Sequence, residues 1–97
     1  MELSLKSKVM LYPGMAGWHF AFVDKKTSEK IKRSQINKKR IGWGSVPVTI
    51  TLGKTIWKTS IFPDKDGTYL LPLKAEVRKN EGVYVDDIIR FKCVLRK

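Results

Sequence analysis

The stretch that decides the fold spans residues 47–90 and reads PVTITLGKTIWKTSIFPDKDGTYLLPLKAEVRKNEGVYVDDIIR. Its first part predicts two antiparallel strands. Apolar and polar residues alternate over 46–52, as in a strand that buries one face. Gly53-Lys54 then predicts a two-residue hairpin turn with glycine at the first central position. The following strand, over 55–62, does not alternate cleanly, so we expect both of its faces to be partly covered.

The second part of this stretch predicts a strand, a short helix and a final strand. The strand over 68–71 leads to Pro72, whose missing amide hydrogen is tolerated just before or at the first turn of a helix. Leu73 and Val77 form the buried side of this helix, and Gly82 ends it in the left-handed conformation. This order of elements predicts a small barrel, and not an open sandwich or a helical bundle.

The first half of the chain echoes this order at an offset of 50 residues. Residues 17–23 (GWHFAFV) parallel residues 67–73 (GTYLLPL), and each segment precedes a short helix candidate and then a strand. The expected N-cap of the first helix is Thr27 or Ser28, with Glu29 in its first turn. Two halves related by a pseudo-twofold axis would close one barrel within a single chain.

Charge is the main clue to function. The formal net charge is +11, from 20 Lys and Arg against nine Asp and Glu. Eight of the basic residues lie between positions 25 and 40, with a single acid in the same window. A concentrated positive field attracts polyanions such as nucleic acids. The alternative is a solvated face that keeps a small protein soluble.

The sequence contains no pattern of catalytic or metal-binding residues. Its single cysteine, Cys93, alternates with apolar residues and is expected to face the core. With one cysteine and one histidine, His19, far apart in the chain, a zinc site lacks ligands. No nucleophile elbow, P-loop or dinucleotide glycine pattern is present. We therefore expect a non-enzymatic protein with no catalytic residue, no metal and no cofactor.

Other single residues have structural interpretations. Trp18 and Trp57 are expected in the core. The helical acids Glu76 and Glu81 are expected to pair with the neighbouring cations, which are Lys74, Arg78 and Lys79.

No membrane segment is expected. No run approaches the about 18 apolar residues of a membrane span, and the first residues alternate instead of forming a signal peptide's continuous apolar segment. We therefore expect a cytoplasmic protein with no membrane partner. We also expect a monomer, because one chain supplies both halves of the barrel.

The basic window and a neighbouring tryptophan form the candidate nucleic-acid site. Several cations would neutralise phosphates, and an aromatic ring beside them could stack on a base. The candidate residues are Lys30, Lys32, Arg33, Lys38, Lys39, Arg40 and Trp43. A core or barrel-mouth position is the alternative for Trp43. Since no recognition helix is apparent, binding is expected to be backbone-directed, salt-dependent and weakly specific.

A second class of function uses similar chemistry on a smaller target. A barrel mouth could accept a small anionic ligand or the acidic segment of a partner protein, without any role in nucleic-acid binding. The salt dependence of binding distinguishes the two classes, because a polyanion releases several counterions and a single small anion about one.

Three segments resemble an uncharacterised family of small barrels, domain of unknown function 1905. They are residues 43–48 (WGSVPV), 57–63 (WKTSIFP) and 70–79 (LLPLKAEVRK). The likeness continues more weakly through Trp18-His19-Phe20 and the first helix, so it covers nearly the whole chain.

This resemblance implies a fold and little about function, since the family has no established activity. It implies a double-split β-barrel similar to that of the AbrB and MazE regulators and antitoxins. The expected structure is mainly β, in one domain over residues 1–97, with about six to seven strands, two short helices and an internal pseudo-twofold. The chain departs from the family pattern at Asp86-Asp87, where Gly-Asp is usual, and at Val23-Asp24, where Leu-Pro is usual.

Overall fold

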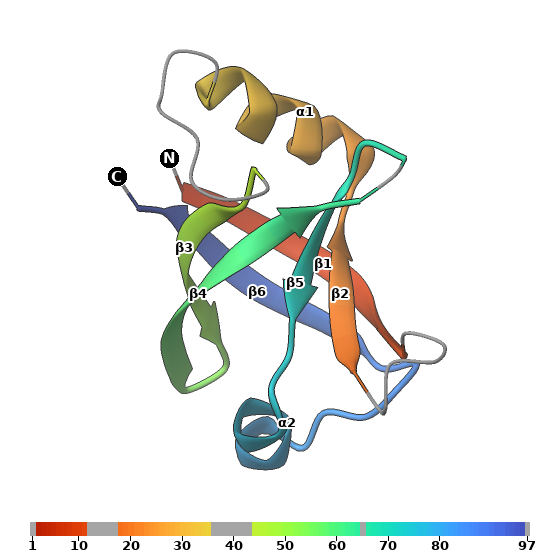
Figure 1. Ribbon diagram of the computed structural model, residues 1–97. Coiled ribbons are helices and arrows are strands. Elements are labelled where there is room, and N and C mark those ends of the chain that lie inside the picture. Colours follow the sequence, from red (N-terminus) through yellow and green to blue (C-terminus); the bar gives the residue numbers. More distant parts are fainter. Residues whose placement is uncertain (1, 12–17, 36–43, 65, 97) are drawn as a thin grey trace.

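A computed structural model describes residues 2–11, 18–35, 44–64 and 66–96 (Figure 1). These residues form six strands and two helices: β1 (Glu2–Leu11), β2 (His19–Val23), α1 (Lys25–Ser34), β3 (Val46–Leu52), β4 (Thr55–Pro63), β5 (Tyr69–Pro72), α2 (Ala75–Glu81) and β6 (Ile88–Leu95). The strands close into an antiparallel barrel in the order β1-β2-β5-β4-β3-β6. The prediction of a mainly β barrel with two short helices is confirmed.

The core fills the inside of this barrel. Every second residue of β3 is buried, as the alternation over 46–52 predicts, and the two-residue turn at Gly53-Lys54 joins β3 to β4. Helices close the two ends of the barrel (Figure 1), with α1 over one end and α2 at the other. Each helix buries an aliphatic side chain in the core, Ile31 from α1 and Val77 from α2.

The two halves of the barrel are related by a pseudo-twofold axis. Exchanging β1 with β4, β2 with β5 and β3 with β6 leaves the cyclic strand order unchanged. In the β2–β5 pair, Ala21 lies opposite Leu71, its counterpart at the 50-residue offset. The 50-residue offset also converts the neighbouring pair Phe20↔Pro72 into the pair Phe22↔Leu70 on the other side, so the axis passes between Ala21 and Leu71. The internal repeat is therefore confirmed.

The N-cap prediction for α1 is wrong. The helix begins at Lys25, and the carboxylate of Asp24 caps it by accepting a hydrogen bond from the Thr27 amide at 3.0 Å. Hydrogen bonding with the Thr27 side chain is the largest cause of the lowered pKa of Asp24, and the hydrogen bond from the Thr27 amide lowers this pKa further. Glu29 consequently lies beyond the first turn. Ser28 is fully buried, and its hydroxyl donates a hydrogen bond to the Val23 carbonyl instead of capping the helix.

The core position expected for Trp18 is also wrong, whereas that of Trp57 is confirmed. In β2 the small residue Ala21 faces the core, and Phe20 lies outside the core cluster although it is buried. Trp18 is half-buried, with its ring centroid 6.1 Å from that of Phe20. Because both faces of β2 carry apolar residues, alternation could not show which one faces inward.

The connection from α2 to β6 depends on left-handed backbone. Gly82 ends α2 with φ 62°, and the Val83 amide donates to the Arg78 carbonyl, as expected of a glycine helix end. Asp86 also has a positive φ, 75°, and its amide donates to the Val9 carbonyl. Asp tolerates this geometry better than most residues, so the turn forms without the family's usual glycine.

Candidate functional site

The structure describes three of the seven residues predicted for nucleic-acid binding. Lys30, Lys32 and Arg33 are exposed on α1, and among the described residues none of them makes an ion pair. A Cβ atom on Gly67 would lie 3.2 Å from the Lys32 amine, so this side of α1 lies next to the β4–β5 turn. The other predicted site residues, which lie outside the described residues, are Lys38, Lys39, Arg40 and Trp43.

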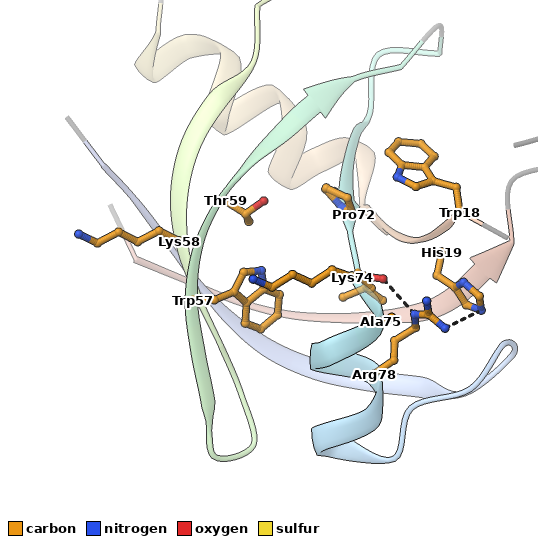
Figure 2. Close-up of a pocket in the computed structure, with 10 residues that line it drawn as sticks. Trp18, His19, Trp57, Lys58, Thr59, Pro72, Lys74, Ala75 and Arg78 are labelled. Atoms are coloured by element: carbon orange, nitrogen blue, oxygen red, sulfur yellow. Dashed lines mark hydrogen bonds between the residues drawn. The ribbon is translucent and has the colours of Figure 1, made fainter. Parts of the chain in front are cut away.

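A pocket that sequence reasoning missed lies where β4 and β5 diverge. β4 has nine residues, but its register pairs with β5 are Phe62↔Leu70 and Pro63↔Tyr69, at its final two residues. The preceding residues of β4 and the chain that leads into α2 line a pocket of about 380 Å³, here called the wedge pocket (Figure 2). Its lining residues are Trp18, His19, Trp57, Lys58, Thr59, Pro72, Leu73, Lys74, Ala75 and Arg78.

Arg78 is the cation of the wedge pocket that two contacts hold in place. Its Nε donates to the Leu73 carbonyl at 3.1 Å, and its Nη1 lies 3.4 Å from Nε2 of His19 (Figure 2). Guanidinium carries five N–H donors in one plane, so these two contacts fix the plane and leave three donors. The side chain is half-buried, and in the described part of the chain no carboxylate forms a salt bridge with it.

The pseudo-twofold shows why the wedge pocket exists on one side of the barrel. Ser28 lies 50 residues before Arg78, and its hydroxyl donates to the Val23 carbonyl at 3.1 Å, as Arg78 does to the Leu73 carbonyl. Ser28 also accepts from the Tyr69 amide, and Tyr69 is the counterpart of His19. The two contact sets are thus equivalent in position and different in chemistry.

The two helices pack differently at the equivalent positions of Ser28 in α1 and Arg78 in α2. α1 has ten residues and places Ser28 and Ile31 in the core with no exposed surface. α2 has seven residues and places a half-buried, charged Arg78 where α1 places the small hydroxyl of Ser28. The first place is closed by packing, whereas the second keeps a pocket lined by a cation.

The wedge pocket combines positive charge with aromatic surface. Lys58, Lys74 and Arg78 are among its lining residues, and none of the ten residues that line it is acidic. In Figure 2, Lys74 extends from the start of α2 in the direction of Trp57, whereas Lys58 points away from the other residues of the pocket. Trp18 and Trp57 supply indole rings. The arrangement is therefore suited to an anion attached to a flat apolar group.

The prediction of ion pairs on α2 is wrong. Lys74 and Arg78, which were expected to pair with the acids of this helix, line the wedge pocket instead. No salt bridge involves Glu76 or Glu81 in the part of the chain that the structure describes. Glu81 instead accepts a hydrogen bond from the Thr55 hydroxyl at 2.5 Å, which joins α2 to the β3–β4 hairpin. The 50-residue echo could have revealed the site, because it equates a neutral Ser28 with a charged Arg78.

Other sites receive little support from the structure. Cys93 is fully buried, and burial raises the pKa of its thiol to about 11, so the thiol is protonated at neutral pH and a poor nucleophile. The described residues include no group of three or more His, Cys, Asp or Glu suited to hold a metal ion. None of their helices combines the length and apolar character that crossing a membrane requires.

Comparison with known proteins identifies a family. The family model described as domain of unknown function (DUF1905) matches residues 6–92, a range that includes both halves of the barrel and the whole wedge pocket. No curated protein matches the chain. The likeness to AbrB and MazE regulators stays a prediction.

Proposed function

Because the chain belongs to the DUF1905 family, a family of unknown function, we propose a function from the wedge pocket itself. The protein is a non-enzymatic binding module that holds an anionic ligand against Arg78, between β4 and the start of α2. It works as a monomer, since both halves of the barrel are supplied by one chain.

The observation that carries this proposal is the environment of Arg78. A partly buried cation loses hydration, and an opposite charge nearby compensates for that loss. Among the described residues no carboxylate supplies this charge. The contacts with Leu73 and His19 hold the guanidinium in one orientation, so its free edge can form paired hydrogen bonds with a carboxylate or a phosphate.

The remaining lining residues indicate what the anion is attached to. A pocket of about 380 Å³ is at the small end of the range for organic ligands, which begins near about 300 Å³. Trp18, Trp57 and Pro72 offer apolar and aromatic surface beside the cations. We therefore assign the ligand to the class of small anions that carry one planar aromatic group, such as a nucleoside monophosphate.

An NMR titration tests this proposal. The probes are AMP, adenosine and inorganic phosphate, added to ¹⁵N-labelled protein, with Arg78→Gln and Lys26→Gln compared with the natural chain. We expect AMP to shift the Arg78 Nε–H signal and a tryptophan indole signal more strongly than adenosine or phosphate alone. Lys26 is exposed on α1, so Lys26→Gln makes the same change of charge outside the pocket.

Two outcomes of this titration would contradict the proposal. One is that none of the three probes shifts signals of the wedge pocket. The other is that AMP shifts the tryptophan indole signal equally in Arg78→Gln and in the natural chain.

Nucleic-acid binding is the second candidate function. Lys30, Lys32 and Arg33 support it, because they are exposed on one helix and make no ion pair among the described residues. If nucleic acid binds at α1, removing two of these charges in Lys30→Gln/Arg33→Gln weakens oligonucleotide binding and reduces its salt dependence. If nucleic acid binds on another face of the molecule, this variant leaves the salt dependence unchanged.

A further inference from the structure

A second basic surface lies on the outer face of β1, β6 and β3, away from the residues predicted from the sequence. β1 and β6 pair in register from Glu2↔Val94 to Lys8↔Ile88. Lys6 lies directly opposite Arg90 in this ladder. In the next outward-facing row, Lys92 of β6 lies between Ser4 of β1 and Thr51 of β3.

The cations of this surface do not serve the fold. Like charges that are directly opposite on neighbouring strands destabilise a sheet, yet Lys6 and Arg90 occupy such a pair and are both exposed. Neither forms a salt bridge within the described part of the chain. The third cation, Lys92, has a long contact of 3.8 Å with Glu2 on an exposed surface, where ion pairs contribute little.

The same residues line a hollow in the surface. It has a volume of about 380 Å³ and is called here the sheet groove. Its lining residues are Ser4, Leu5, Lys6, Thr51, Arg90, Phe91 and Lys92, and none of them is acidic. Leu5 and Phe91 belong to the buried core, so the side chains that the groove presents outward are cations and hydroxyls.

We propose that the sheet groove binds the phosphate backbone of duplex nucleic acid. Lys, Arg, Ser and Thr are the side chains that contact phosphate oxygens in protein–DNA complexes. The paired strands β1, β6 and β3 set these groups in rows along one face of the sheet, which suits the regular spacing of phosphates on a duplex. Proteins that bind single strands instead use exposed aromatic rings on which bases stack, and the one aromatic residue of this groove, Phe91, is buried.

This inference is independent of the proposed function. The sheet groove shares no residue with the wedge pocket, and none with α1. A duplex on the groove would have up to three of its phosphates neutralised, by Lys6, Arg90 and Lys92. The predicted dependence of log K on log salt therefore has a slope of about −3, because each phosphate contact on duplex DNA contributes about −0.9.

The test is fluorescence anisotropy with a labelled mixed-sequence DNA duplex of about 20 base pairs, titrated at salt concentrations from about 50 to 200 mM. The same labelled strand without its complement is the second probe. The natural chain is compared with Lys6→Gln/Arg90→Gln and with Lys30→Gln/Arg33→Gln, which removes the same charge from α1. We expect the slope for the duplex to become shallower by about 2 in the first variant and to stay unchanged in the second.

Several outcomes would overturn the inference. They are no binding of the natural chain at the lowest salt, an equal loss in both variants, a loss in the α1 variant alone, and tighter binding of the single strand than of the duplex. A urea unfolding curve provides a further check. Because Lys6→Gln/Arg90→Gln removes a like-charge pair, it should unfold at no lower urea concentration than the natural chain, and a clear destabilisation would show that the two cations serve the fold.

Discussion

Replacing Ile31 by alanine tests why the α1 end of the barrel has no counterpart of the wedge pocket. Ile31 projects from α1 into the core with no exposed surface, next to the buried Ser28. Figure 1 shows α1 lying over one end of the barrel. If Ile31 closes this end, Ile31→Ala leaves a hole there and weakens the attachment of the whole helix.

The expected cost follows from the atoms that are removed. The substitution deletes three buried carbon atoms, which are worth about 2.4 kcal/mol at about 0.8 kcal/mol per buried methylene. The cavity left behind adds to this loss, and measured Ile→Ala substitutions in cores fall in the range of about 2–5 kcal/mol. We therefore expect the free energy of unfolding to fall by about 3 kcal/mol, within this range.

The assay is equilibrium unfolding in urea, followed by circular dichroism. With a slope of about 1–3 kcal/mol per molar urea for a small domain, the midpoint should fall by about 1–3 M. The matched control is Ile56→Ala on β4, where the isoleucine is 67% exposed and the cost should stay near about 0.5 kcal/mol. A loss below about 1 kcal/mol for Ile31→Ala, or equal losses for both variants, would refute the reasoning.

Three further predictions concern local features. In Gly53→Ala, the new Cβ would collide with the Glu81 carboxylate at a residue with φ 58°, so we expect the free energy of unfolding in urea to fall by about 1–3 kcal/mol. Adding Glu81→Ala to this variant should reduce the loss without abolishing it, because the positive φ remains. An unchanged unfolding midpoint in Gly53→Ala would contradict the placement of α2. Asp24→Ala removes the cap of α1 and should cost about 1 kcal/mol at neutral pH. Because the folded-state pKa of Asp24 lies below its ordinary value of 3.8, this stabilisation is present above that value and is lost as the pH falls through the folded-state pKa. The difference between Asp24→Ala and the natural chain should therefore shrink in acid, and an equal difference at about pH 7 and about pH 2 would contradict the role of the carboxylate as cap. The buried Cys93 thiol, with its pKa raised to about 11, should react with iodoacetamide at pH 8 in urea and hardly at all in the folded protein, and fast labelling of the folded protein would contradict its burial.

Much of the fold was predictable from local patterns. The alternation over 46–52, the Gly53-Lys54 turn and the glycine at 82 each depend on a few neighbouring residues, and each is found in the structure. The 50-residue echo was informative for the same reason, since both halves repeat one order of elements. The side of β2 that faces inward was not predictable, because apolar residues occupy both faces and distant strands decide which face the barrel encloses.

Local patterns did not predict the wedge pocket, because it arises from a difference between two distant parts of the chain that only the 50-residue echo relates. In isolation, Arg78 on α2 is one more cation beside acidic neighbours, and local spacing favours helical ion pairs. The barrel instead directs Arg78 to the nearby Leu73 carbonyl and to His19, which is 59 residues away in the sequence. The sheet groove has the same origin, since Lys6 and Arg90 meet only when the last strand pairs with the first.

The most direct test of the anion-binding account is isothermal titration calorimetry with AMP. The dissociation constants of the natural chain, Arg78→Gln and Lys26→Gln would be compared at one low salt concentration, after unfolding curves show that all three are folded. Hydrogen bonds to a charged group contribute about 1.5–3 kcal/mol, so the account predicts that AMP binds Arg78→Gln about 10- to 100-fold more weakly and binds Lys26→Gln as it binds the natural chain. Equal affinity for the natural chain and Arg78→Gln would contradict it.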